Sequence, residues 1–191
     1  MKSLKIVKSL IVAAMVGIVA LSSFNSAEDK LVNKNGHISF FSHTAVEDIT
    51  ANNYTVVSTF SPSTGEVVFS VAMQSFEFEK ALMQKHFNSD KFLDTKTYPK
   101  AKLVGKITNL SEINFSKDGT YEATVEGELT MHGETKTIKE NGKITISGGK
   151  IKVDAKMNIV LADYKIAFEN GKPSTNIAKE VEATIAVEYT K

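Results

Sequence analysis

Apolar and polar residues alternate with a period of two along most of the chain after residue 36. From Tyr121 to Met131 the odd positions are apolar or small, whereas the even positions are Glu or Thr. Successive side chains of a β-strand point to opposite faces, so this segment is predicted to be a strand with one buried and one solvated face. Similar rows predict further strands within 38–40, 54–60, 67–73, 103–107, 144–146, 151–161 and 181–189.

Short turn signals separate these rows, at 61–65, 117–119, 131–134 and 147–150. About eight strands with mostly short connections predict an antiparallel meander that closes into a barrel or a sandwich. The polar face is rich in Lys and Glu, and the chain has no Trp to form the aromatic girdles of an outer-membrane barrel. We therefore expect the polar face to be the solvated exterior and the apolar face to be the interior.

The segment 75–101 interrupts the alternation. Within it, 79–87 places Leu82, Met83, His86 and Phe87 on one side of a short helix. An apolar, partly helical insert in a β-rich chain predicts a cap over the barrel or part of a cavity wall. A second short helical turn is expected at 162–166.

Two glycines, Gly105 and Gly127, fall at inward positions of predicted strands. Glycine weakens a strand interior unless the sheet bends, another backbone approaches closely or space is needed. A bend beside a filled core and an internal cavity both remain open as explanations.

The N-terminus has the pattern of a secretory signal. Lys2, Lys5 and Lys8 precede the apolar run 10–21, which is short for a membrane span of about 20 residues. Cleavage after Ser22 and cleavage after Ala27 both fit the small residues that follow. We expect 1–27 to be a signal peptide and 28–191 to form one periplasmic or secreted domain without an integral membrane span.

Composition argues against several kinds of chemistry. The chain has no Cys, which excludes disulfides, thiolate metal sites and cysteine nucleophiles. All 23 basic residues are Lys, the formal net charge is +1 and no basic cluster stands out, so nucleic-acid binding is not expected. The four His residues do not follow the standard zinc spacings, and no nucleophile elbow occurs. We expect no metal, no cofactor and no enzymatic activity.

Several strings occur in an order that resembles the YceI-like family of exported polyisoprenoid-binding proteins. They are Ser75-Phe76, the stretch LMQKHFN at 82–88, KTYPKA at 96–101 and GELTMHGETK at 127–136. The resemblance covers essentially all of 36–189. It implies an all-β fold, an extended antiparallel eight-stranded lipocalin-like barrel with a short helical insert, that encloses a long apolar ligand.

The resemblance implies that an amphiphilic polyisoprenoid-like lipid or a quinone is the partner. The apolar rows would then line the cavity with Phe69, Val71, Met73, Val125, Leu129, Met157 and Ile159. The insert would close or line one end with Phe76, Phe78, Leu82, Met83 and Phe87, and His86 or Tyr164 would orient a head group. Monomer and homodimer both remain open.

Two other functions remain open. The first is an envelope protein-interaction module with a filled barrel and no lipid. The second is a hydrolase or isomerase acting on a lipid, which would need His86 or His43 within hydrogen-bond reach of a carboxylate at the cavity wall.

Overall fold

A computed structural model describes residues 29–44, 47–169, 172–173 and 177–190. The expected signal peptide at 1–27 lies outside the described residues. The long strands are Leu31–His43 (β1), Asp48–Phe60 (β2), Glu66–Ala72 (β3), Lys100–Ile107 (β5), Gly119–Met131 (β6), Glu134–Ser147 (β7), Lys150–Val160 (β8) and Glu180–Thr190 (β11). The short elements are β4 (Glu77–Phe78), β9 (Phe168–Glu169), β10 (Lys172–Pro173), the helix α1 (Ala81–Asn88) and the 3₁₀ helices Met73–Ser75, Leu110–Glu112 and Leu161–Tyr164.

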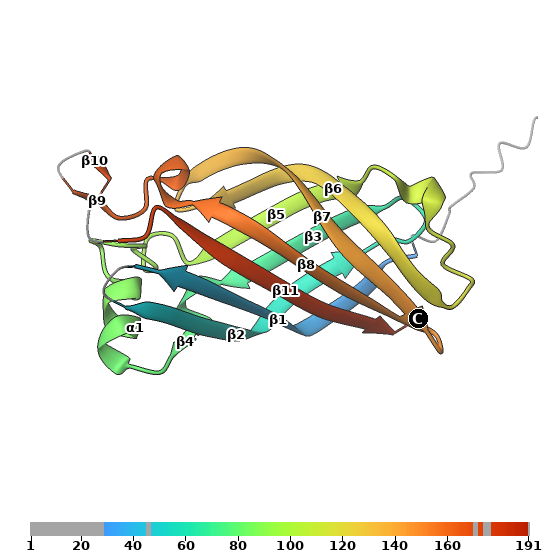
Figure 1. Cartoon of the computed structure of the whole chain (residues 1–191), viewed down its shortest axis with the longest axis horizontal. Coiled ribbons are helices and arrows are strands. Elements are labelled where there is room, and N and C mark those ends of the chain that lie inside the picture. The colour runs from blue at the N-terminus through green and yellow to red at the C-terminus, as the bar shows by residue number, and fades with distance from the viewer. Residues whose placement is uncertain (1–28, 45–46, 170–171, 174–176, 191) are drawn as a thin grey trace, which may run out of the picture.

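The long strands form one closed antiparallel barrel, in the order β1-β11-β8-β7-β6-β5-β3-β2, and β1 also pairs with β2 to complete the circle. The barrel is elongated along its axis, and the strands cross it obliquely (Figure 1). The expected eight-stranded lipocalin-like barrel with a short helical insert is therefore confirmed. Within the described residues, no helix is long and apolar enough to span a membrane.

The apolar rows face the barrel interior. Ile144, Ile146 and Ile151 are 2%, 3% and 0% exposed, and they lie on paired positions of β7 and β8. The outward positions of the same strands carry many Lys side chains, several of which form exposed ion pairs with acids on neighbouring strands, such as Lys150–Glu188 at 2.7 Å. Such exposed pairs contribute little to stability, so burial of the inward rows holds the barrel together.

A bulge between β1 and β2 changes which residues of β2 face inward. The register shifts between Gly36 and Ile38, and the buried positions of β2 change from Ala51 and Asn53 to Val56 and Phe60. The Asn53 side chain holds the bulge, because its Oδ1 accepts a hydrogen bond from the Thr55 backbone N–H at 2.9 Å.

Tyr54 shares a row with Val56 and Phe60 in the sequence pattern, but the bulge turns it outward. It is 54% exposed and stacks on His37, with ring centroids 4.5 Å apart. An alternating pattern read across a bulge assigns residues on its far side to the wrong face.

The two inward glycines allow close approach of adjacent strands. Gly105 and Gly127 are directly opposite each other on β5 and β6. A Cβ atom on Gly127 would lie 2.3 Å from the Val104 carbonyl oxygen and 2.5 Å from the Gly105 Cα atom. The glycines are therefore required by the close approach of β5 and β6 at this point.

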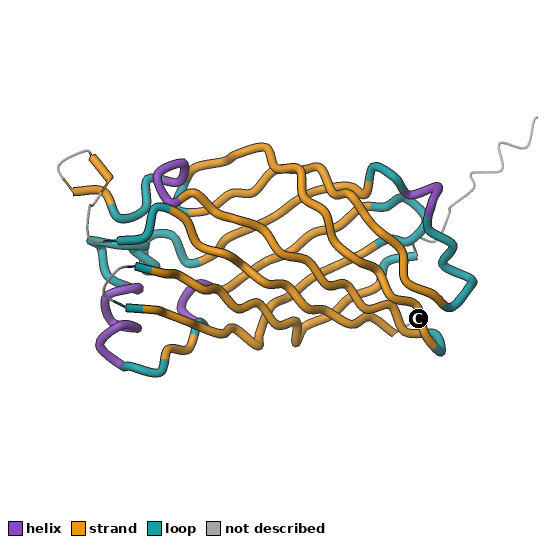
Figure 2. Tube along the Cα trace, viewed as in Figure 1, coloured by secondary structure: helices purple, strands orange, loops and turns teal. Residues whose placement is uncertain are grey.

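Helical segments gather at the two ends of the barrel, and strands form the wall between them (Figure 2). α1 and the 3₁₀ helix Leu161–Tyr164 lie at one end, which we call the α1 end. The β7–β8 hairpin and the 3₁₀ helix Leu110–Glu112 lie at the other, which we call the hairpin end. The helix expected at 79–87 is present at Ala81–Asn88, and the turn expected at 162–166 is the 3₁₀ helix.

Candidate ligand-binding cavity

Side chains fill the barrel at the hairpin end. Phe60 packs against Phe115 and Tyr189, with ring centroids 5.6 and 5.8 Å away. The Tyr189 hydroxyl donates a hydrogen bond to Ser58 Oγ at 2.8 Å, and both residues are buried. Burial raises the pKa of Tyr189 to about 12, because the charged phenolate is poorly solvated there. This end of the barrel is therefore a packed core.

The interior is hollow in the half of the barrel nearer the α1 end. A cavity of about 870 Å³ extends between the strands and the insert, within the usual range of about 300–1,000 Å³ for small-molecule sites. Most of the residues expected to bind a ligand line it, namely Phe69, Val71, Met73, Phe76, Phe78, Met83, His86, Phe87, Leu129, Met157 and Ile159.

Five aromatic rings close the cavity beneath α1. Phe87 of α1 lies against Phe40, Phe76, Phe78 and Phe92, with ring centroids between 4.9 and 6.1 Å away. Offset and edge-on contacts of this kind are the favoured arrangements of aromatic side chains. The insert thus adds its own apolar cluster to the end of the barrel.

Hydrogen bonds fasten the insert to itself and to the barrel. Thr95 Oγ1 donates to Asn88 Oδ1 at 2.8 Å, and Gln74 Nε2 donates to the Thr95 carbonyl oxygen at 3.3 Å. Lys80, which precedes α1, pairs with Glu47 at the start of β2. The insert that covers the α1 end is therefore held in place by hydrogen bonds and an ion pair.

Three of the expected ligand residues lie elsewhere. Val125 lines a separate space of about 70 Å³ nearer the middle of the barrel. Leu82 is 63% exposed, because it precedes Met83 by one helical position and so faces about 100° away from the cavity side of α1. Tyr164 is buried in the 3₁₀ helix outside the cavity lining, and burial raises the pKa of its hydroxyl.

Sequence reasoning missed part of the lining. Phe40 and Phe92 join the aromatic cluster, and Leu103, Ala183 and Ile185 form part of the cavity wall. The period-two pattern marks most of these residues as inward, but it carries no sign of which inward residues meet a cavity and which meet a filled core.

The backbone pairing between β7 and β8 ends partway along the two strands. The two strands are paired from the hairpin up to Gly142 and Ala155, whereas residues 134–141 of β7 and 156–160 of β8 have no pairing with each other among the described residues. Figure 1 shows the strands separating away from the hairpin. We call this unpaired region the β7–β8 slot.

The open end of the slot is held by side chains. His132 in the β6–β7 turn donates a hydrogen bond from Nδ1 to the Tyr164 carbonyl oxygen at 2.9 Å, and Lys165 pairs with Glu134 at 2.6 Å. His132 and Gly133 adopt φ angles of 51° and 80°, which a tight hairpin turn requires. The His-Gly pair within the string 127–136 is thus a turn that also ties β7 to the 3₁₀ helix.

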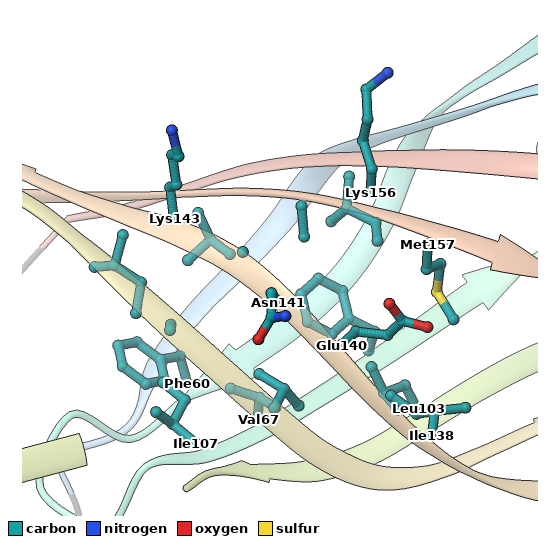
Figure 3. A pocket seen from close by; sticks show the side chains of 18 of the residues that line it. Phe60, Val67, Leu103, Ile107, Ile138, Glu140, Asn141, Lys143, Lys156 and Met157 are labelled. Atoms are coloured by element: carbon teal, nitrogen blue, oxygen red, sulfur yellow. The ribbon is translucent and has the colours of Figure 1, made fainter. Parts of the chain in front are cut away.

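The 70 Å³ space lies where the paired and unpaired parts of β7 meet, since Ile138, Gly142 and Ile144 all line it. Most of its lining is apolar, and it shares Phe69, Leu103, Met157 and Ile185 with the large cavity. The polar residues of the lining are Glu140, Asn141, Lys143 and Lys156. Asn141 accepts a hydrogen bond from Thr124 at 2.9 Å. The Glu140 carboxyl group points toward Met157, and the amino groups of the two lysines point away (Figure 3). Burial raises the pKa of Glu140.

A possible acid–base pair lies at the α1 end. His43 contributes to the cavity lining, and its Nδ1 atom is 2.5 Å from Asp48 Oδ1. The two side chains are 73% and 60% exposed, as is usual for a surface ion pair. Among the described residues, no group of three or more His, Asp or Glu side chains is arranged to hold a metal ion.

The fold is shared with several solved structures. A polyisoprenoid binding domain from Saccharophagus degradans matches with a TM-score of 0.70 and 16% identity, over 85% of this chain and 98% of that one. BcnA from Burkholderia cenocepacia matches with a TM-score of 0.68 and 18% identity, over 81% and 96% of the two chains. At these identities the comparison establishes the architecture.

Sequence comparison gives the family. A UPF0312 protein of Pseudomonas fluorescens is 26% identical over 186 residues, covering 89% of this chain and 93% of the relative. Protein YceI of Escherichia coli O157:H7 is 28% identical over 134 residues, covering 67% and 64%. The model of the YceI-like domain matches residues 26–189, which includes all of the barrel except the last residue of β11, together with the insert and the cavity. The chain therefore belongs to the YceI-like family.

Proposed function

We propose that this protein is an exported carrier that binds one amphiphilic lipid, of the polyisoprenoid or isoprenoid quinone class, inside the barrel. The observation that carries the proposal is the apolar cavity of about 870 Å³, which adjoins a packed core at one end and an aromatic cluster at the other. The polyisoprenoid binding domain of similar fold supports the choice of ligand class.

The energetics favour a long chain. Burial of each CH₂ group contributes about 0.8 kcal/mol. Association itself costs roughly 4–15 kcal/mol, so a ligand needs on the order of ten or more buried carbons before affinity becomes useful. Met73, Met83 and Met157 line the cavity, and flexible thioether side chains repack around an irregular chain.

The open cavity favours lipid binding over a protein-interaction module with a filled barrel. Packed side chains occupy the hairpin end, where Phe60 and Tyr189 meet, but the α1 half of the barrel has room for a ligand. The exposed His43–Asp48 pair gives no specific reason to propose hydrolysis.

A cavity-filling substitution tests this function. Ala183 is 5% exposed and lines the cavity, and its neighbour Thr184 lies on the opposite face of β11. Protein purified from its native compartment should yield an isoprenoid lipid on organic extraction and mass spectrometry. Ala183→Trp should lose most of this lipid, because the indole occupies its space, whereas Thr184→Trp should retain it.

Two results would contradict the proposal. One is an organic extract of the wild-type protein that contains no apolar small molecule, and the other is equal lipid content in the two Trp variants. Circular dichroism of both variants confirms that any loss of lipid occurs in a folded barrel.

A further inference from the structure

Glu140 is an acidic residue at an inward position of the barrel where its neighbours are mostly apolar. It lies on β7 between Ile138 and Gly142, directly opposite Val125 of β6, and it lines the 70 Å³ space together with these three residues. Almost every other inward position nearby is apolar or glycine. A half-buried carboxyl at such a position is unfavourable unless something pairs with it.

Neighbouring acids on the outer face have partners. Glu126 pairs with Lys139 at 2.7 Å, and Glu182 pairs with Lys156 at 2.6 Å. Glu140 forms no ion pair or hydrogen bond with any residue that the structure describes, and burial alone raises its pKa. The amino groups that could neutralise it face outward (Figure 3).

The slot explains how a polar group can reach Glu140. Ile138, Glu140 and Met157 stay half-buried along the unpaired parts of β7 and β8, whereas Ile144 and Ile151 on the paired parts are buried. The space at Glu140 adjoins the large cavity, and four residues line both of them. A molecule with an apolar chain in the cavity can therefore extend its polar end to the wall.

We propose that Glu140 and the β7–β8 slot form the subsite for the polar end of the bound lipid, and that this end is an alcohol or an amine. The inference rests on the proposed lipid-binding function and adds the chemistry of the head group. The hydroxyl or ammonium group donates a hydrogen bond to the Glu140 carboxyl group, while the chain runs past Met157 toward the aromatic cluster under α1.

The charge of the Glu140 carboxylate favours some lipid head groups over others. A carboxylate in a partly desolvated site attracts a hydrogen-bond donor or a cation, and it repels an anion such as a phosphate or diphosphate. The nearest lysines on this lining, Lys143 and Lys156, pair with Glu122 and Glu182 outside the barrel, at 3.8 and 2.6 Å. The slot therefore discriminates against phosphorylated lipids by its charge.

Four ligands that share the same isoprenoid chain and differ only at its polar end test the subsite. Delipidated full-length mature protein is offered an equimolar mixture of geranylgeraniol, the amine and the monophosphate of the same chain, and the hydrocarbon without a head group. Bound lipids are then quantified by mass spectrometry. The wild type should bind the alcohol and the amine at least about tenfold over the hydrocarbon and the phosphate, as hydrogen bonds to a charged group imply.

Variants at position 140 separate the two interactions. Glu140→Leu should remove the preference for the alcohol and the amine without reducing binding of the hydrocarbon. Glu140→Gln should keep the preference for the alcohol and lower that for the amine. Glu128→Leu on the exposed face of β6 is the matched control, and it should behave as the wild type.

The outcomes separate this inference from the proposed function. If the wild type binds the hydrocarbon as well as the alcohol, or prefers the phosphate, the Glu140 subsite is wrong but lipid binding stands. If none of the four ligands binds, the proposed function is wrong. A preference that persists unchanged in Glu140→Leu also rules out the subsite.

Discussion

Tyr189 helps to fill the hairpin end of the barrel and so limits how far the hollow interior extends. Its ring packs on Phe60 and its hydroxyl donates to Ser58, so an aromatic residue and a buried hydrogen bond together fill the hairpin end. A buried phenol that loses its proton becomes a poorly solvated anion, and this gives the filled end a defined response to pH.

We expect the free energy of unfolding to fall as the pH rises from about 10 to about 12. The Tyr189 pKa is raised from 10.0 to about 12 in the folded protein, so the unfolded chain loses this proton first and becomes favoured. The full contribution is about 2 to 3 kcal/mol.

Urea unfolding at several pH values measures this effect. Tyr189→Phe should show a shallower decline above pH 10 than the wild type, because both proteins share every other titrating group. At neutral pH the variant should also lose about 1 kcal/mol, since Ser58 loses its buried partner. Parallel curves for the two proteins above pH 10 would contradict the assignment.

At the scale of a strand, the pairing of β7 with its neighbours bears on access to the barrel interior. Its second half is paired on both sides, with β6 and with β8, whereas its first half is paired only with β6. The α1 end is covered by an insert with several hydrogen bonds, whereas the first half of β7 has no backbone pairing with β8, so we expect the ligand to enter through the slot.

A cross-link across the slot should slow lipid uptake. Continuing the β7–β8 register beyond Gly142 and Ala155 places Lys139 opposite Asn158, both exposed, and the chain has no native Cys to interfere. Lys139→Cys with Asn158→Cys, joined by a short bismaleimide, should lower the rate of uptake of a fluorescent isoprenoid at least severalfold.

Two further cysteine pairs complete this experiment. Lys143→Cys with Asp154→Cys lies on the paired half of the same strands and should leave the uptake rate unchanged. Glu47→Cys with Lys80→Cys joins the insert to β2 at an existing ion pair. If this last pair blocks uptake and the Lys139–Asn158 pair does not, the ligand enters under α1.

The sequence predicted the strands wherever inward positions are apolar. Ile144, Ile146, Ile151 and Val153 marked the paired half of β7 and β8, but the first half of β7 was missed because Glu140 and Gly142 interrupt its inward row. That interruption was the available signal for the slot. It could not be recognised without the pairing of β6 with β7, which sets the face on which Glu140 lies.

The candidate site was predictable only in outline. Each inward row gave residues that can line a cavity, and most of those named do so. The boundary between filled and open interior depends on Phe60, Phe115 and Tyr189, which are far apart in the sequence and meet only in the folded barrel. No local pattern distinguishes Val71 beside the cavity from Val56 in the packed core.

At the scale of the whole molecule, the barrel has a packed half and a hollow half. The hollow half lacks the side-chain contacts that a filled interior would supply. If the protein binds lipid as proposed, the lipid acts as part of the core, and its contribution should appear in the stability of the entire domain.

Lipid loading should raise the free energy of unfolding through mass action. A ligand present at 100 times its dissociation constant adds about 2.7 kcal/mol, provided that it does not bind the unfolded chain. Thermal unfolding of delipidated and reloaded protein measures this difference, with Ala183→Trp as the control that should not respond. Equal melting temperatures for loaded and delipidated wild type would exclude the cavity as the binding site.

The point at which β7 and β8 cease to pair affects how the barrel wall can move. Gly142 is the last paired residue of β7, and a Cβ atom there would lie 2.9 Å from the Asp154 carbonyl oxygen, so the two strands touch at this point and diverge beyond it. We expect the wall to widen about Gly142 while the hairpin end keeps its hydrogen bonds. A barrel that widens there would accept ligands of different width, because no backbone pairing between β7 and β8 would have to break.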